Sequence, residues 1–397
     1  MKHVTKIIAL MLALTIMVAA FAACAPAPKE EAAPVKEEAA PEKEEAKPAE
    51  AMTYGTEKLD REYYIGKIPI TLSHAVHGND AKYAAIYAKE KYGAKYEVID
   101  PAQDLQKEIA AMETFIAKGV DGIILHPVTE AGVNEIIKEA RDAGVYVVTY
   151  FMRPTIAQVP HVQAFEDSIA AEMGTDMAKQ WMELYPDKPV KVGFIDFLSV
   201  AYCFDYRSGP FLTAVKKVVP DLEGEVTGIF NTAGEELLGA TYWLAGEGDL
   251  TKAQAAAQDG LTAHPEVNII YATNTPNVLG AISAYEAVGR GKAVDGIPLT
   301  EIFAGTDGDA PELVKLADPT SSLKYTMGMQ PASFAIAQVD TMMKTILGEI
   351  DPDTYSLTPE YDLYMNYYKD SVKDLEDWYN LQYFGTLDIA AELAKKN

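Results

Sequence analysis

Short apolar runs alternate with amphipathic stretches from about Tyr63 onward, and this alternation dominates the chain. In the first half the apolar runs, each predicted to be a strand, are residues 67–73, 96–100, 122–127 and 145–150. In the second half they are residues 191–196, 226–230, 268–273, 301–305 and 323–329. Helical spacing of apolar residues predicts helices over residues 79–93, 102–118, 206–218, 236–263 and 331–348, and one more that Thr129 caps and Gly144 ends. Alternating strands and helices indicate βαβ units, in which helices cover both faces of a parallel sheet.

The number of predicted strands bears on how many sheets the chain forms. One large sheet is possible, but a chain of this length more often divides into units that each have a core of their own. We therefore expect an α/β fold with two doubly wound parallel-sheet lobes.

The N-terminus has the composition of an export signal. A basic start at residues 2–6 precedes an uncharged apolar run at residues 7–23, which is short for a transmembrane helix. Small residues directly before Cys24 resemble a bacterial lipobox, in which the cysteine is lipidated and becomes the first mature residue. An ordinary signal peptide cut at Ala23 and an uncut anchor are the alternatives. In each case the mature chain works outside the cytoplasm, and the lipobox predicts a lipid anchor at Cys24.

The segment after Cys24 differs from the rest of the chain in composition. Residues 25–52 alternate Pro, Ala, Glu and Lys without apolar periodicity. Such a sequence buries too little to offset its ordering entropy. We expect residues 24–60 to form an extended tether.

Charge and cysteine content exclude several classes of function. The chain has 34 Lys and Arg against 59 Asp and Glu, a net charge of −25, which argues against binding nucleic acid or anionic lipid. Two cysteines exclude a disulfide-rich scaffold and a Cys-rich zinc module. With Cys24 lipidated, Cys203 is left to be a small buried hydrophobe.

Polar and aromatic residues gather after the predicted strands, where open parallel sheets bind ligands. Amides and carboxylates bond hydroxyl pairs, Arg spans two oxygens and rings cover C–H faces, so the set suits a neutral polyol. The candidates of the first half are His77, Asp80, His126, Tyr150, Phe151 and Arg153. Those of the second half are Phe204, Arg207, Asn274, Asp307 and Gln330.

Three histidines at one predicted sheet edge raise a second hypothesis. His74, His77 and His126, with Asp80, supply the ligand types of a zinc site. Hydrogen bonding to a hydroxyl, or no role at all, is the simpler interpretation. We therefore predict no metal and no cofactor.

Five segments in order resemble the type I periplasmic sugar-binding proteins of ABC transporters, close to the ribose-binding group and related to the ligand-binding domain of LacI-type repressors. The segments are residues 122–149, 204–217, 261–284, 303–313 and 325–335. The resemblance implies that Arg207 binds sugar hydroxyls, that Asn274 and Asp307 contact the sugar, and that Gln330 lies near the hinge.

The sequence departs from that family in the first half. After the fourth predicted strand it has Thr149-Tyr150-Phe151-Met152-Arg153, without the Asp that the family often has. After the first it has histidines instead of paired aromatic residues. A nucleoside or a signalling furanone therefore stays open as an alternative ligand.

The resemblance implies an extracytoplasmic, monomeric binding protein that closes on a small sugar-like polyol and delivers it to a permease. It implies a three-segment hinge, which we place near residues 167, 330 and 356. The expected lobes are 61–167 with 331–356, and 168–330 with 357–397, the last carrying a Tyr-rich tail. No hydrolase, metalloprotease or nucleotide-binding motif occurs, so we expect no enzyme. A surface lipoprotein hydrolase and a metal-capturing lipoprotein remain the alternatives from other classes.

Overall fold

The computed structural model describes residues 56–163, 166–352, 356–357, 364–366 and 369–395. The predicted signal segment, Cys24 and most of the predicted tether lie outside these residues. Within them, no helix combines the length and the apolar content that crossing a membrane requires.

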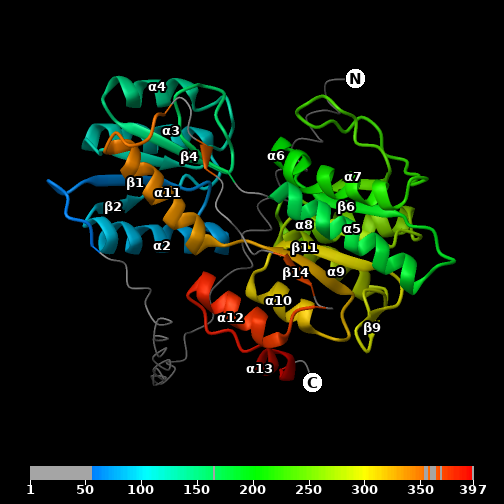
Figure 1. Ribbon diagram of the computed structural model, residues 1–397. Coiled ribbons are helices and arrows are strands. Elements are labelled where there is room, and N and C mark those ends of the chain that lie inside the picture. Colours follow the sequence, from blue (N-terminus) through cyan, green and yellow to red (C-terminus); the bar gives the residue numbers. More distant parts are fainter. Residues whose placement is uncertain (1–55, 164–165, 353–355, 358–363, 367–368, 396–397) are drawn as a thin grey trace, which may run out of the picture. The chain divides into compact units, whose positions relative to one another are not determined.

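The first sheet has six strands, all paired in parallel. Its order is β13 (Ser356–Leu357), β5 (His161–Val162), β4 (Tyr146–Tyr150), β3 (Gly122–Leu125), β1 (Tyr64–Ile68) and β2 (Lys95–Val98). One face packs on α2 (Ala75–Tyr92) and α11 (Pro331–Ile346), the other on α3 (Leu105–Lys118) and α4 (Asn134–Asp142). Figure 1 shows α11 in orange beside the blue α2, although the two helices are far apart in sequence.

The second sheet also has six strands, five of them parallel. Its order is β14 (Tyr364–Asn366), which is antiparallel, then β12 (Leu323–Gly328), β11 (Ile302–Asp307), β8 (Ile269–Ala272), β6 (Val192–Asp196) and β7 (Ala240–Ala245). One face packs on α8 (Leu250–Ala263), α9 (Thr275–Ala287) and α10 (Ala310–Ala317), the other on α5 (Glu166–Leu184) and α7 (Gly209–Val218).

Smaller elements complete the second lobe. They are α6 (Ala201–Cys203), a π-helical turn η1 (Phe204–Ser208), the hairpin β9 (Ala293–Val294) with β10 (Ile297–Pro298), and α13 (Ile389–Ala394). The helix α12 (Val372–Tyr383) contacts both lobes, α11 and α2 of the first and α10 of the second. The chain passes between the lobes three times, from β5 to α5, from β12 to α11, and from β13 to β14. The predicted fold class, two doubly wound parallel-sheet lobes, is confirmed.

Several predicted elements are wrong, each for a local reason. The first strand ends at Ile68, because Pro69 lacks the N–H that a strand would need. Residues 240–245, predicted to be helical, form β7, whose Tyr242 and Trp243 suit a pleated sheet. The predicted strand 226–230 contributes one isolated bridge, at Phe230.

Two helix predictions also need correction. Thr129 does not cap α4; its hydroxyl accepts the Gly132 N–H inside a preceding turn, and the cap position is Val133. No element was predicted over residues 166–184, where α5 lies.

Candidate functional site

A cavity of about 650 Å³ lies at the carboxyl edges of the strands, lined by residues of both lobes. The lining residues follow β1, β2, β3 and β4 in the first lobe, and β6, β7, β8, β11 and β12 in the second. Parallel strands place their carboxyl ends at one edge, which is why residues far apart in sequence meet here. Six predicted contacts line the cavity: His77, His126, Phe151, Arg207, Asn274 and Asp307.

The first lobe contributes three rings, His77, His126 and Phe151, which we call the first rim. They follow the neighbouring strands β1, β3 and β4 and lie in mutual contact. The ring centroids are 5.1 Å apart for His77 and His126, 5.3 Å for His126 and Phe151, and 5.8 Å for His77 and Phe151. Phe151 also stacks on Phe334 of α11 at 4.5 Å. Its φ of 57° is a strained backbone conformation of a kind that clusters at functional sites.

The first rim carries no charge at neutral pH. Burial lowers the pKa of His77 well below 6.5 and that of His126 to about 3. The Nδ1 atoms of both rings are buried and have no hydrogen-bond partner among the described residues. A neutral imidazole nitrogen can donate or accept, depending on the tautomer. The rim therefore offers two uncharged ring nitrogens beside an apolar ring.

The residues of the zinc hypothesis do not lie together as a metal site. Among the described residues, the three histidines and Asp80 do not form a group whose ligand atoms lie within 4.8 Å of one another. Asp80 is instead buried in the first-lobe core, where its carboxylate accepts from Lys67 and Gln338.

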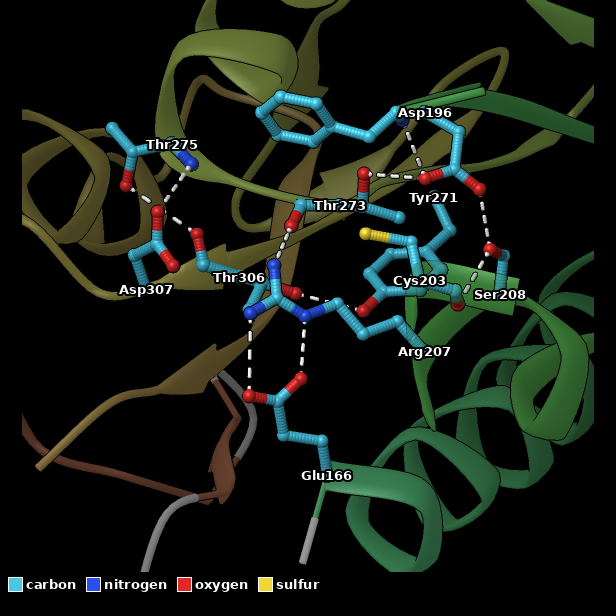
Figure 2. Close-up of polar contacts among 11 residues, drawn as sticks. Glu166, Asp196, Cys203, Arg207, Ser208, Tyr271, Thr273, Thr275, Thr306 and Asp307 are labelled. Carbon is cyan, nitrogen blue, oxygen red and sulfur yellow. Dashed lines mark hydrogen bonds and ion pairs between the residues drawn. The ribbon is translucent and has the colours of Figure 1, made fainter. Parts of the chain in front are cut away.

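The second lobe contributes Arg207, held from two sides (Figure 2). Its Nε and Nη2 donate to the fully buried Glu166 carboxylate at 2.5 and 3.2 Å, and its Nη1 donates to the Thr273 carbonyl oxygen. Burial works to lower the pKa of the guanidinium, but Glu166 raises it well above the ordinary value. Three of five N–H groups are thus engaged, which leaves two to bind a ligand.

A π-helical turn sets the direction of Arg207. In η1 the Gly209 N–H bonds the Phe204 carbonyl oxygen five residues back. A Cβ at Gly209 would lie 2.1 Å from that oxygen, so only glycine permits the turn. Single π turns of this kind occur frequently at functional sites.

The residues around Arg207 are fixed by a buried carboxylate, Asp196. It accepts from Trp243 Nε1 at 2.9 Å, from Thr273 Oγ1 at 2.8 Å and from the Ser208 hydroxyl. Figure 2 shows Thr273 between Asp196 and Arg207, with its hydroxyl donating to the Asp196 carboxylate and its carbonyl oxygen accepting from Arg207. Asp196 therefore supports the site from within the lobe core.

Asn274 and Asp307 complete the predicted second-lobe contacts. Asn274 caps α9 through its Oδ1, which accepts from the Asn277 N–H at 2.9 Å, and it also lines the cavity. Asp307 Oδ2 accepts from the Thr275 N–H at 3.2 Å. The φ of Asp307 is 100°, so a strained backbone aims this carboxylate as well.

The C-terminal helix α12 holds the Asp307 turn in place. The Tyr383 hydroxyl donates to the Asp307 carbonyl oxygen at 2.9 Å. A Cβ at Gly308, whose φ is 73°, would lie 3.1 Å from both the Trp378 ring and the Gly328 Cα, so this position is tightly packed and favours glycine. Two residues on, Asp309 also lines the cavity. Burial raises the pKa of both carboxyls, to about 8 for Asp307 and about 6 for Asp309. We call Arg207, Asn274, Asp307 and Asp309 the second rim.

Five predicted contacts are placed elsewhere among the described residues. Asp80 and Tyr150 are buried in the first-lobe core, and Phe204 packs edge-on against Trp243 in the second. Arg153 is exposed outside the cavity. Gln330 is buried at the start of α11, where its Oε1 accepts from Ser333. The polar residues after β4 and β12 thus turn away from the cavity that their strands reach.

Sequence reasoning missed Glu166 and Asp309. Nothing in its neighbourhood marks Glu166, because it meets Arg207 only through the packing of α5 on the second sheet. Asp309 lies in the same turn as Asp307, so the two acids two positions apart could have indicated that both line the site. Cys203 is buried, free and part of the cavity wall, as expected of a small hydrophobe.

Comparisons with known proteins identify the family of the chain. A family model described as periplasmic binding protein domain matches residues 65–350. The chain is 24% identical over 271 residues to the ribose import binding protein RbsB of Bacillus subtilis, covering 68% of this chain and 77% of that protein. It is 24% identical over 271 residues to the galactofuranose-binding protein YtfQ of Escherichia coli, covering 62% and 77%.

Solved structures show the same fold. A protein of Mycobacterium smegmatis in complex with β-D-fucofuranose superposes with a TM-score of 0.64 at 18% identity, covering 84% of this chain and 98% of that one. At this identity the likeness speaks for the fold alone. With the family match over residues 65–350, the chain belongs to the periplasmic binding protein family.

Proposed function

We propose that the protein is the extracytoplasmic substrate-binding component of an ABC importer, and that it captures a sugar or sugar-like polyol. The observation that carries this proposal is the Arg207 guanidinium, fixed by Glu166 and Thr273 on a cavity wall with two N–H groups left over. Paired N–H groups on a rigid plane match vicinal hydroxyls, and fixing them beforehand reduces the entropy lost on binding.

Binding proceeds by capture between the rims. The second rim supplies charge-assisted hydrogen bonds, and the first rim supplies Phe151 as an apolar surface and two neutral imidazole nitrogens. Closure around the ligand removes water and strengthens these bonds, which gives selectivity. The ligand is released unchanged to a permease, because no step of capture requires covalent chemistry.

A ligand panel tests this function. Purified protein lacking residues 1–24 is screened by thermal shift against pentoses, hexoses, furanosides, inositols, nucleosides and furanones. We expect a stabilising shift with members of the sugar or polyol set, and mass spectrometry should recover those ligands intact. Conversion of a ligand to product would contradict the proposal, and so would shifts confined to nucleosides or furanones.

Membrane attachment is a separate part of the proposal. It rests on the lipobox-like sequence before Cys24. Mass spectrometry of the N-terminal peptide from the membrane-bound protein should show an acylated Cys24, and Cys24→Ser should release the protein from membranes. An unmodified N-terminus at residue 24 would contradict the anchor and leave the binding function standing.

A further inference from the structure

The charges of the second rim do not balance. The positive charge of Arg207 is already matched by the buried Glu166, which binds it through two N–H groups. The two remaining acids of the 307–309 turn therefore have no buried cation of their own among the described cavity residues. Counted together, two basic side chains, Arg207 and the exposed Lys252, accompany four acidic ones: Glu166, Glu247, Asp307 and Asp309.

The acid with the clearest geometry is Asp309. It stands at the N-cap position of α10, yet its side chain makes no capping bond. Its Oδ1 is buried and has no hydrogen-bond partner among the described residues. Glu247 differs, because its two oxygens accept from the Leu198 N–H and the Ser199 hydroxyl. Asp309 thus keeps an oxygen available that a simple cap would have used.

The opposite wall brings no compensating charge. The first rim consists of two neutral imidazoles and a phenyl ring, and His74 beside it is also shifted toward the neutral form by burial. His126 is 7% exposed, and its Nδ1 has no partner among the described residues. Closing this wall over the 307–309 turn removes the remaining water from both acids without bringing a protein cation to pair either of them, and ionising a carboxyl group there is costly, as the raised pKa values of Asp307 and Asp309 indicate.

We propose that the ligand itself supplies the missing cation, as a protonated amino group on a sugar or cyclic polyol. The ammonium lies between Asp307 and Asp309, hydroxyls take the two remaining N–H groups of Arg207, and the C–H face of the ring covers Phe151. This assignment rests on the proposed function of the cavity and narrows its ligand class. It follows from the arrangement of charges, since an ammonium provides short charge-assisted bonds to carboxylates that a hydroxyl cannot match.

Matched ligands test the proposal by isothermal titration calorimetry. Each set holds a neutral sugar, its amino-deoxy derivative and the N-acetylated form of that derivative: galactose, galactosamine and N-acetylgalactosamine, the glucose and mannose sets, and myo-inositol with an amino-deoxyinositol. We expect at least one amine to bind tenfold or more tightly than its neutral counterpart. N-acetylation, which removes the charge, should abolish that preference in the unaltered protein.

Two variants locate the effect. Asp309→Asn should remove most of the amine preference, measured as the ratio of the affinities for the amine and its neutral counterpart, and circular dichroism confirms that the variant is folded. Asp142→Asn, on an exposed position of α4 outside the cavity, is the matched control and should change neither affinity.

The outcomes separate the inference from the function on which it rests. Neutral sugars that bind as tightly as their amines, or more tightly, overturn the inference and support sugar binding. An amine preference that survives Asp309→Asn overturns the placement of the ammonium. Absence of binding throughout the sets, with the thermal-shift panel also negative, contradicts the proposed function and the inference together.

Discussion

The two walls of the cavity differ in kind. The first rim is made of buried rings whose titratable members stay neutral, whereas the second rim carries a guanidinium, an amide and two carboxylates. The second rim is fixed by a network that includes Glu166, Asp196 and Tyr383. The first rim is held mainly by ring packing, such as Phe151 on Phe334.

This difference suggests a division of work. A charged wall can hold and orient a polar ligand before closure, because its hydrogen bonds are strong even while water is present. A neutral wall can then close at little desolvation cost and exclude water from those bonds. If the protein binds ligand as proposed, the second lobe is expected to determine which ligand binds and the first lobe how long it stays.

The largest effect on binding and stability should come from removing Arg207. Arg207→Ala deletes the paired donors and leaves Glu166 buried without its cation, so we expect loss of binding and a fall of about 3–5 kcal/mol in the free energy of unfolding. Calorimetric titration and urea unfolding measure the two effects. Arg207→Ala combined with Glu166→Gln should recover much of the stability and none of the affinity. A single variant that keeps its affinity, or a double variant no more stable than the single one, would count against this account.

Changing the π turn should misplace the same guanidinium without deleting it. Gly209→Ala forces a Cβ against the Phe204 carbonyl oxygen, so we expect the turn to open and the affinity to fall by about 10- to 100-fold. Thr213→Ala, exposed on the same helix, is the control and should bind normally. If Gly209→Ala binds as tightly as the unaltered protein, the π turn has no part in placing Arg207.

The pH dependence of stability should have opposite signs at the two rims. The folded-state pKa of Asp307, about 8, lies above its ordinary 3.8, so its contribution to stability is present below pH 4 and is lost as the pH rises to about 8. Asp309 and Glu166 face this carboxyl and strengthen the shift, while Arg207 opposes it. Asp307→Asn should reduce the loss of stability with rising pH, which is at most about 1.4 kcal/mol per pH unit for one proton.

At the first rim the dependence of stability on pH has the opposite sign. The pKa of His126, about 3, lies below its ordinary 6.5, so the stability that it contributes is present above pH 6.5 and is lost as the pH falls toward 3. Lys67, His161, Arg207 and His74 all reinforce this shift. Urea unfolding of His126→Gln between pH 4 and 7 should show a smaller dependence on pH than the unaltered protein. The same slope for both proteins would mean that His126 is charged in the folded state.

The smallest effect should come from the C-terminal helix. Tyr383→Phe removes the hydrogen bond to the Asp307 carbonyl oxygen, which contributes about 1 kcal/mol, so the affinity should fall by about fivefold. Tyr379→Phe, in the ring that stacks on Tyr383 at 4.8 Å, is the matched control. Equal affinities for the two variants would show that α12 does not support the ligand turn.

The sequence predicted those parts of the site that depend on strand order. His126 and Phe151 come directly after β3 and β4, and His77 lies in the first turn of the helix that follows the neighbouring β1. Arg207, Asn274 and Asp307 occur in segments that resemble the family. Whether a residue after a strand turns inward depends on local backbone geometry, which is why Arg153 was placed wrongly.

Contacts between elements distant in sequence could not be predicted in this way. Glu166 meets Arg207 because α5 packs on the second sheet, and α5 itself was missed. Asp80 was chosen for its chemistry, but a buried lysine inside a strand, Lys67, binds its carboxylate. The strand β7 was taken for helix because Ala and Leu accompany its aromatic residues.

Hydrogen exchange measured by mass spectrometry, with and without a ligand from the panel, tests the central claim most directly. If the ligand is clamped between the rims, protection should appear together in peptides covering residues 73–77, 126–128 and 151 of the first lobe and residues 203–209 and 307–309 of the second. Protection confined to one lobe, at saturating ligand, would contradict the claim.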